Sequence, residues 1–460
     1  MDFPRKTVLS VGCLVAMVVA LERIPSLSNY RLMDWDALVQ VVEFRPSVLT
    51  PRDPIVAAEV KLKPGRALEK TGARMAVEPL SDPTGSLDSF YTAIERVEAG
   101  EPGATVRLAH YGDSPTTADL ITADVRVLLQ KRFGDAGHGY YLIAKPWAWY
   151  GHRGVDSDSS GWEVEASNLS KNRDGYYGYG GVSFKGGAGA SAKFRLKEAG
   201  YARVEVSYWQ QPGGGNFVVE ACGERLGDRS TSGDPDEGFA EFVVPADCKE
   251  IVVRVESGQV RMFGLQFLRG TNGVIYDSLG LNGAYISVLA KFLKPEHWAN
   301  TLQHFEPDVV VINYGTNESV YAAFVDTVFE KELRETIRRI RGALPGKSIL
   351  VMSPMDRGER NASGQIETVP ALQRLVELER KIAANEGVAF FNTFEAMGGN
   401  GTMAKWYAAE PRLVGADFIH PMPGGAKIIG NLLYKAILDG YNRHKTGKRT
   451  AGRAKTDSGL

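Results

Sequence analysis

ATVRLAHYGDS, residues 104–114, is the stretch that decides the expected fold. It begins with an apolar run of strand length that ends at Tyr111. The residues that follow, from 118 to 133, have the spacing of an amphipathic helix. Ser114 therefore lies where a strand meets a helix, at the carboxyl end of an expected sheet. Open α/β folds bind their ligands at that edge.

A serine at this point of an α/β fold has two interpretations. The helix that follows presents free N–H groups and the positive end of its dipole, which suit the oxyanion that forms when a serine attacks an ester. Asp113 and Ser114 are also common N-cap residues, so the same pair fits a purely structural role. Other segments of the chain are needed to decide between them.

Two later segments place hydrogen-bond donors at the same edge. LGLNGA, residues 279–284, is predicted to turn into a helix over 283–293, so that the Gly283 N–H faces the sheet end. GTNE, residues 315–318, follows a predicted apolar strand and places the Asn317 amide there.

A fourth segment, DFIH, occupies residues 417–420 before the last predicted helix. A carboxylate three residues before an imidazole can accept the Nδ1–H of that ring while Nε2 points at a serine. Taken in order, the four segments resemble the SGNH hydrolases, or GDSL-like esterases, which are named after Ser, Gly, Asn and His in four sequence blocks. The resemblance covers residues 104–135 and 278–440.

The resemblance implies a role for each residue that the four segments bring forward. Ser114 is the nucleophile, His420 the general base and acid, and Asp417 the partner that orients His420. The N–H of Ser114, Gly283 and the Asn317 amide form the oxyanion hole. The implied reaction is a two-step acyl transfer through an acyl-enzyme, which needs neither a metal nor a cofactor.

The chain departs from the family pattern at two positions. Glu318 stands where the family more often has Asp, which leaves the hydrogen bonding behind the oxyanion hole open. Pro115 replaces the Leu that named the family, and we expect no effect from it. No G-x-S-x-G, H-E-x-x-H or C-x-x-C motif occurs, which argues against an α/β-hydrolase and a metal site. The formal net charge of -1 gives no electrostatic attraction for nucleic acid.

Predicted strands and helices alternate before residue 151 and after residue 270, whereas the segment between has no helical pattern. The alternation predicts an α/β fold, and the resemblance implies a flavodoxin-like parallel sheet. Between residues 151 and 270 short alternating runs are separated by Gly, Asp and Ser, which is typical of an inserted all-β sandwich domain. The expected organisation is a signal peptide or membrane anchor at 1–23, a linker at 24–80, the hydrolase domain at 81–150 and 271–444, the inserted domain at 151–270 and a basic disordered tail at 445–460.

The N-terminal segment indicates export. Arg5 and Lys6 precede an apolar run over residues 7–21, which is shorter than the roughly 20 residues of a transmembrane helix. A buried N-terminal helix is the alternative. We expect a periplasmic or membrane-anchored protein that faces the cell envelope. An oxidising compartment would allow Cys222 and Cys248 to pair, and two buried thiols are the alternative.

Three residues before the inserted segment are candidates for substrate binding. His138, Trp147 and Trp149 would line an acyl or sugar pocket. In the alternative, the aromatic rings belong to the core and the histidine is an ordinary satisfied side chain.

Export and an inserted β domain together resemble the bacterial peptidoglycan O-acetylesterases, which are SGNH enzymes with a carbohydrate-binding-like module. The first hypothesis is therefore hydrolysis of an O-acetyl ester on a cell-envelope polysaccharide, with an acylated carbohydrate as the partner. A lipid esterase and a polysaccharide O-acetyltransferase are alternatives within the enzymes. A non-catalytic glycan-binding protein is the alternative from another class.

Overall fold

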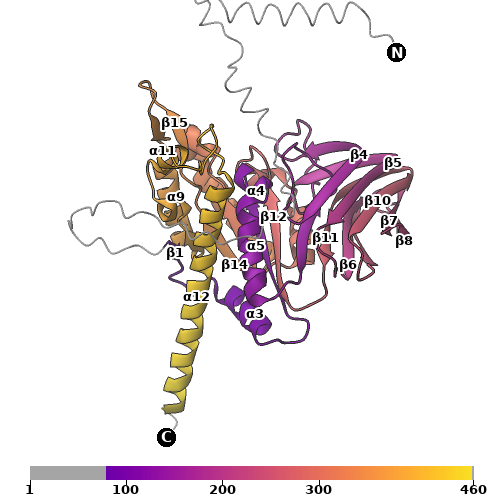
Figure 1. The fold of residues 1–460 in the computed structure, drawn as a ribbon, viewed down its shortest axis with the longest axis horizontal. Coiled ribbons are helices and arrows are strands. Elements are labelled where there is room, and N and C mark those ends of the chain that lie inside the picture. The colour runs from indigo at the N-terminus through magenta and orange to yellow at the C-terminus, as the bar shows by residue number, and fades with distance from the viewer. Residues whose placement is uncertain (1–78, 458–460) are drawn as a thin grey trace, which may run out of the picture. The chain divides into compact units, whose positions relative to one another are not determined.

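A six-stranded sheet forms the centre of the structure, a computed structural model that describes residues 79–457 and their side chains as far as 447 (Figure 1). Its spatial order is β1-β17-β14-β13-β2-β12. The strands are β1 (Leu80–Ser81), β2 (Thr105–Gly112), β12 (Gly273–Gly280), β13 (Val309–Asn313), β14 (Ser348–Met352) and β17 (Ala389–Phe391). All neighbours are parallel except β1, which pairs antiparallel with β17. In chain order the parallel strands lie 2-1-3-4-5, as in flavodoxin-like folds, so the expected α/β class is confirmed.

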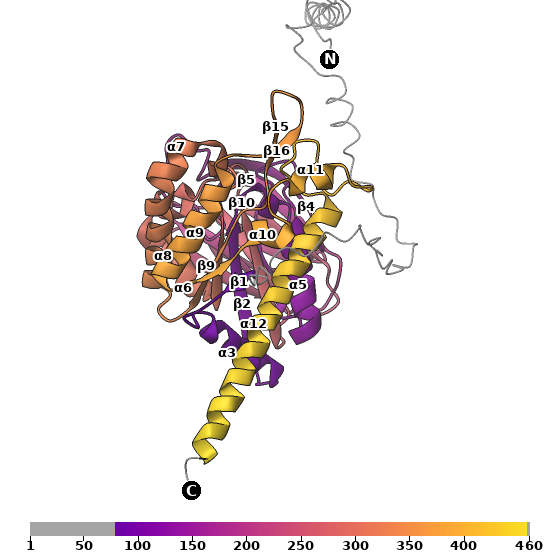
Figure 2. The same ribbon diagram turned by 90° about the vertical axis from the view of Figure 1, so that its left-hand side faces the viewer.

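Helices cover both faces of this sheet because every parallel strand is apolar on both sides. In β13, for example, Val310 and Ile312 belong to one buried cluster, whereas Val309 and Val311 belong to the other. The first cluster includes residues of α6 (Pro295–Phe305), α8 (Glu330–Ala343) and α9 (Leu372–Glu386). The second includes residues of α3 (Asp88–Glu98), α5 (Leu120–Phe133) and α12 (Pro423–Asp457). Figure 2 shows these two sets of helices.

A second, antiparallel sheet of nine strands lies between α5 and β12 in the sequence. Its main path is β8-β7-β10-β5-β11-β6-β9, with β3 on β11 and β4 on β5. The strands are β3 (Gly137–Leu142), β4 (Val155–Ala166), β5 (Val182–Leu196), β6 (Arg203–Gln210), β7 (Asn216–Ala221), β8 (Glu224–Ser230), β9 (Asp236–Val243), β10 (Glu250–Ser257) and β11 (Gln259–Leu268).

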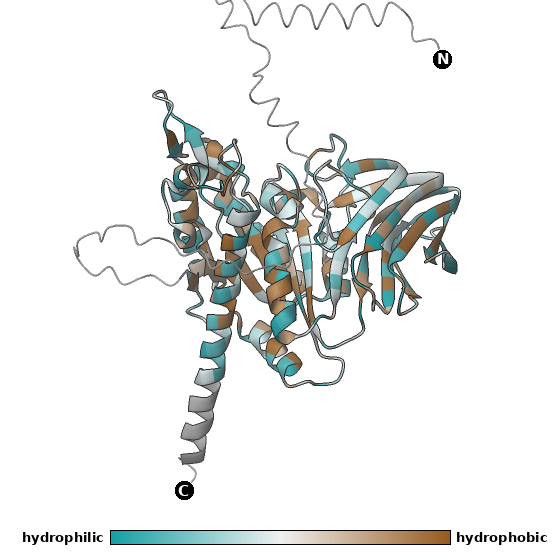
Figure 3. Cartoon of the chain, in the orientation of Figure 1, coloured by the Kyte–Doolittle hydropathy of each residue, from teal (hydrophilic) through white to brown (hydrophobic). Residues whose placement is uncertain are grey.

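Alternating hydropathy explains why these strands form an antiparallel sheet. In β10, Ile251, Val253 and Val255 are buried while the residues between them are not fully covered. Figure 3 shows this mixture of apolar and polar residues along the strands. The sheet begins with β3, upstream of the boundary expected at residue 151. Cys222 and Cys248 form a disulfide in it, with their Cα atoms 5.7 Å apart.

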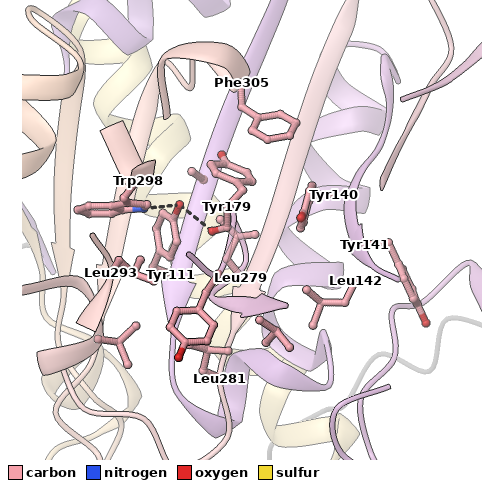
Figure 4. Packing of buried hydrophobic residues seen from close by; sticks show 14 of the residues in the cluster. Tyr111, Tyr140, Tyr141, Leu142, Tyr179, Leu279, Leu281, Leu293, Trp298 and Phe305 are labelled. Carbon is pink, nitrogen blue, oxygen red and sulfur yellow. Dashed lines mark hydrogen bonds between the residues drawn. The ribbon is translucent and has the colours of Figure 1, made fainter. Parts of the chain in front are cut away.

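The two sheets share one buried core. Trp298 of α6 donates a hydrogen bond to the Tyr111 hydroxyl of β2 (3.1 Å), which in turn donates to the carbonyl of Tyr179 (3.1 Å), in the loop between β4 and β5 (Figure 4). The buried carboxylate of Asp277 in β12 pairs with Arg107 of β2 at 2.9 Å. Buried contacts of this kind join the nine-stranded sheet to the α/β part.

Asp277 also accepts hydrogen bonds from the nine-stranded region. The Tyr140 N–H of β3 donates to it at 2.8 Å and the Tyr179 hydroxyl at 3.1 Å. Arg107 reaches the Gln266 side chain of β11 at 2.6 Å. One carboxylate of the parallel sheet therefore accepts from three residues, two of which belong to the nine-stranded region.

The structure differs from the sequence predictions at three elements. β12 was not expected, because its polar Asp277 and Ser278 interrupt an otherwise apolar run. The helix predicted over 283–293 is a short π-helix, η2 (Val288–Phe292), and Gly283 is not part of it, since its φ of +69° is one that no right-handed helix uses. α12 continues to Asp457 instead of giving way to a disordered tail at 445.

The predictions for the N-terminal part are not addressed by the structure. The signal or anchor at 1–23 and nearly all of the 24–80 linker lie outside the described residues. Within residues 79–457 no helix has the length and apolar character needed to cross a membrane. The remaining short elements are α4 (Ser114–Thr117), η3 (Glu318–Val320), α7 (Ala322–Phe324), η4 (Val325–Phe329), β15 (Gly358–Arg360), β16 (Ile366–Thr368), α10 (Thr393–Met397) and α11 (Thr402–Tyr407).

Candidate active site

Ser114, His420 and Asp417 form a continuous hydrogen-bonded chain. Ser114 is the first residue of α4, directly after β2. Its Oγ lies 2.8 Å from Nε2 of His420, and Nδ1 of the same ring lies 2.5 Å from Oδ2 of Asp417. A carboxylate only accepts, so Nδ1 carries the proton and Nε2 is free to accept from the serine hydroxyl. This is the arrangement in which an imidazole acts as a base toward serine.

The loop that carries Asp417 and His420 is held by hydrogen bonds from its backbone N–H groups to the Asp417 side chain. Oδ1 of Asp417 accepts the N–H groups of Ile419 (3.0 Å) and His420 (3.1 Å). Burial raises the pKa of Asp417, but the hydrogen bonds from His420 and Ile419 outweigh it and hold the pKa below its usual value. Asp417 is therefore ionised at neutral pH and can stabilise a charged imidazole.

Two glycines let helix α4 lie directly on the strand ends. A Cβ on Gly280 would lie 2.3 Å from the Thr117 N atom, and a Cβ on Gly112 would lie 2.3 Å from Oγ1 of Thr116. Any side chain at Gly280 would collide with backbone, so α4 and its serine would have to move. Ser114 remains 9% exposed in this position.

The strand register brings the other expected donors to the same place. Gly112 of β2 lies opposite Gly280 of β12 on one side and Asn313 of β13 on the other. Gly283 and Asn317 follow those two neighbouring strands, and Nδ2 of Asn317 donates to the Ala284 carbonyl at 2.9 Å. That bond uses one of the two amide hydrogens, so the second can serve a ligand.

Glu318 ties the two donor loops together from behind. One carboxyl oxygen accepts the Ile286 N–H at 2.7 Å and the other the Gly315 N–H at 3.1 Å. Burial raises the pKa of Glu318 to about 8, against the effect of these two donors. The sequence left open whether Glu318, in place of the usual Asp, could form the hydrogen bonds behind the oxyanion hole. In the structure it forms two, one to each donor loop.

Two further carboxyl groups are buried near Glu318. Burial raises the pKa of Asp113 to about 6 and raises that of Glu379 well above its usual value. Asp113 also raises the pKa of Glu318, and Glu318 and Asp113 both raise the pKa of Glu379. At neutral pH Glu318 and Glu379 are therefore mostly uncharged, so they oppose the negative charge of an oxyanion less strongly than two carboxylates would.

The residues proposed for substrate binding separate into two environments. His138 is buried in β3, 3.3 Å from Nδ1 of His152, and burial lowers its pKa well below the usual value. It fits the structural alternative, and Trp147 likewise packs against the core. Trp149 is 54% exposed and lines a pocket of about 480 Å³ together with Lys145 and Arg195.

Sequence reasoning missed three residues that the structure brings to the site. Arg357, after β14, donates to the Thr316 carbonyl at 2.6 Å, beside Asn317. Tyr285 follows the Gly283 loop, with its ring centre 6.3 Å from that of Tyr321. None of the three lies in a recognisable motif, so their place at the site follows from the tertiary fold alone.

Comparison with known proteins bears on this site. The model of the GDSL-like lipase/acylhydrolase family matches residues 254–428, which contain Gly283, Asn317, Asp417 and His420. The match does not include Ser114, which the chain places before the nine-stranded sheet. A search of the curated proteins found no match.

A solved structure shares this fold. A peptidoglycan O-acetylesterase is 22% identical, with a TM-score of 0.67 over 79% of this chain and 99% of its own. A family two carbohydrate esterase from Clostridium thermocellum in complex with cellohexaose is 13% identical over 62% of this chain and 98% of its own, with a TM-score of 0.27. The chain carries a GDSL-like lipase/acylhydrolase domain over residues 254–428, as the resemblance to the SGNH hydrolases implied. It is a carboxylic ester hydrolase.

Proposed function

We propose that this esterase works through a Ser114-His420-Asp417 triad and an acyl-enzyme. The observation that carries the proposal is the chain of hydrogen bonds from Asp417 through both ring nitrogens to Oγ of Ser114. His420 takes the hydroxyl proton as Oγ attacks the ester carbonyl, and it returns the proton to the leaving alcohol. Water, deprotonated by the same ring, then attacks the acyl carbon; the bond to Oγ breaks, His420 returns the proton to Oγ, and the acid is released.

The oxyanion of each tetrahedral intermediate is held by three donors in this proposal. They are the N–H of Ser114 at the start of α4, the N–H of Gly283 and the free amide hydrogen of Asn317. The positive end of the α4 dipole adds to their field only modestly because the helix is short.

We further propose that the substrate is an O-acetyl ester on a cell-envelope polysaccharide. The fold match to a peptidoglycan O-acetylesterase supports this class by analogy only. At the site itself Ser114 is 9% exposed, but the His420 side chain that contacts it is 46% exposed, so His420 faces an open surface that a polymer can approach. Tyr321, which is 58% exposed, offers an aromatic face that suits a sugar ring.

The same exposure bears on the acyltransferase alternative. Water reaches a half-exposed His420 freely, so an acyl-enzyme here is open to hydrolysis. Hydrolysis is therefore the proposed outcome, and transfer to a sugar hydroxyl would need that water to be excluded.

Acetate release from O-acetylated peptidoglycan tests the substrate class. We expect release from the native glycan, none from glycan stripped of acetyl groups by mild base, and faster turnover of p-nitrophenyl acetate than of p-nitrophenyl decanoate. The S114A variant supplies the blank. A preference for the decanoate ester together with no acetate release from glycan would contradict the proposal and favour a lipid esterase.

Asn317→Ala should lower kcat for p-nitrophenyl acetate by about 10²–10³, the cost of one oxyanion donor, with little change in KM. Asn431→Ala is a matched control, because Asn431 is an exposed amide on α12 that donates to the Lys427 carbonyl. A rise in KM alone would instead make Asn317 a substrate-binding residue. A melting curve separates this effect from loss of the Asn317 bond to Ala284.

A further inference from the structure

Asn168 connects the nine-stranded sheet to the Gly283 loop. It lies just after β4, and its Nδ2 donates to the Asn282 carbonyl at 2.7 Å. That carbonyl and the Gly283 N–H belong to one planar peptide group. In a trans peptide the two point to opposite sides, so a donor that holds the carbonyl also fixes the direction of the N–H.

We propose that Asn168 is a positioning residue for the oxyanion hole, a role that rests on the proposed function of Gly283. Asn168 fixes the 282–283 peptide so that the Gly283 N–H faces the oxygen bound at Ser114. The inserted segment thereby takes part in catalysis without touching the reacting atoms.

The 282–283 peptide needs such a partner because little else holds it. Gly283 is exposed, has a φ of +69°, and a Cβ there would meet no atom within 4 Å. The neighbouring bonds are Leu281 N–H to Gly112 (3.0 Å) and Ala284 N–H to Leu281 (3.2 Å), and neither involves this peptide. Among the described residues, Asn168 supplies the hydrogen bond that restrains it.

The loop that carries Asn168 is itself well anchored. The Ser167 N–H donates to the Gly181 carbonyl at 3.0 Å. Arg173 donates to the Ser167 carbonyl at 2.6 Å and to the Asn168 carbonyl at 3.2 Å, and its guanidinium lies 4.0 Å from the centre of the Phe292 ring. Phe292 belongs to η2 of the α/β part, so the loop is fixed to the same part that carries Gly283.

Steady-state kinetics of two variants test the proposal. Asn168→Ala removes the donor, and Asn168→Asp keeps the shape but places a second acceptor against the carbonyl. We expect kcat for p-nitrophenyl acetate to fall about tenfold to hundredfold in both, less than the loss of a whole donor, with KM unchanged. Affinity for a small alkyl boronic acid, whose Ser114 adduct puts a negative oxygen in the hole, should fall in parallel. Asn172→Ala, in an exposed part of the same loop, should match the wild type.

The outcomes distinguish this inference from the proposed function. Wild-type kcat in folded Asn168 variants, with an inactive S114A protein, overturns the role of Asn168 and leaves the triad intact. A rise in KM without a change in kcat also overturns it, because Asn168 would then contact the substrate. An active S114A protein refutes the proposed function itself. If Asn168→Ala fails to fold, the nearly isosteric Asn168→Asp variant decides.

Discussion

Ser114→Ala and His420→Ala should each lower kcat for p-nitrophenyl acetate by about 10⁴ or more, and the double variant should lose no further activity. The reason is that Oγ and Nε2, 2.8 Å apart, act as one unit, so that removing either ends nucleophilic attack. What activity remains would come from substrate binding and the oxyanion donors alone. Steady-state rates and labelling by a serine-reactive phosphonate measure both effects.

The folded state of these variants is the necessary control, and it is expected to be unchanged because neither Ser114 nor His420 belongs to the two buried apolar clusters. A folded S114A protein that keeps near wild-type turnover would refute the triad. Additive losses in the double variant would mean that the two residues act in separate steps.

Asp277→Ala should lower the free energy of unfolding by about 3–5 kcal/mol, because it leaves the buried Arg107 guanidinium without its counter-charge. The Tyr140 N–H and the Tyr179 hydroxyl lose their acceptor in the same change. Urea denaturation, followed by tryptophan fluorescence, measures the loss.

Two comparisons locate the cause of that loss. Asp228→Ala removes an exposed carboxylate that pairs with Arg225 at 3.1 Å, and it should change stability little. Replacing both members of the buried pair, in R107M/D277L, should cost less than Asp277→Ala alone, because no unpaired charge remains. A double variant that is less stable than the single one would show that the hydrogen bonds of Asp277, and not its charge, dominate.

Hydrophobic periodicity predicted those helices and strands in which the apolar residues follow one regular pattern from end to end. The strand before Ser114 and the helix expected over 118–133 are regularly patterned, and β2 and α5 lie within two residues of the expected bounds. β12 was not predicted because Asp277 breaks its apolar run, although in the folded protein this carboxylate pairs with Arg107. A sequence window cannot show that this carboxylate meets Arg107, more than a hundred residues earlier.

The site residues also divide into those that a local sequence pattern predicts and those that depend on tertiary contacts. Ser114, Asn317, Asp417 and His420 stand at element ends in short recognisable blocks, so their convergence could be predicted. Asn168 has no such signal, because its contact with Asn282 exists only after the inserted segment packs on the α/β part. His138 gave a misleading signal, since a histidine among glycines and aromatic residues looks the same whether it lines a pocket or, as here, lies in the core.

The distance in sequence between Ser114 and His420 sets the order in which the protein acquires its properties during synthesis. The serine leaves the ribosome early and the histidine only after all nine antiparallel strands have been made. His420 reaches the serine when α12 docks, and Gly430 of that helix lies against Asp124 of α5, one helix beyond Ser114. Contacts of such sequence separation form late in folding. Under the proposed triad, the growing chain therefore gains hydrolytic activity only once α12 has packed against α5.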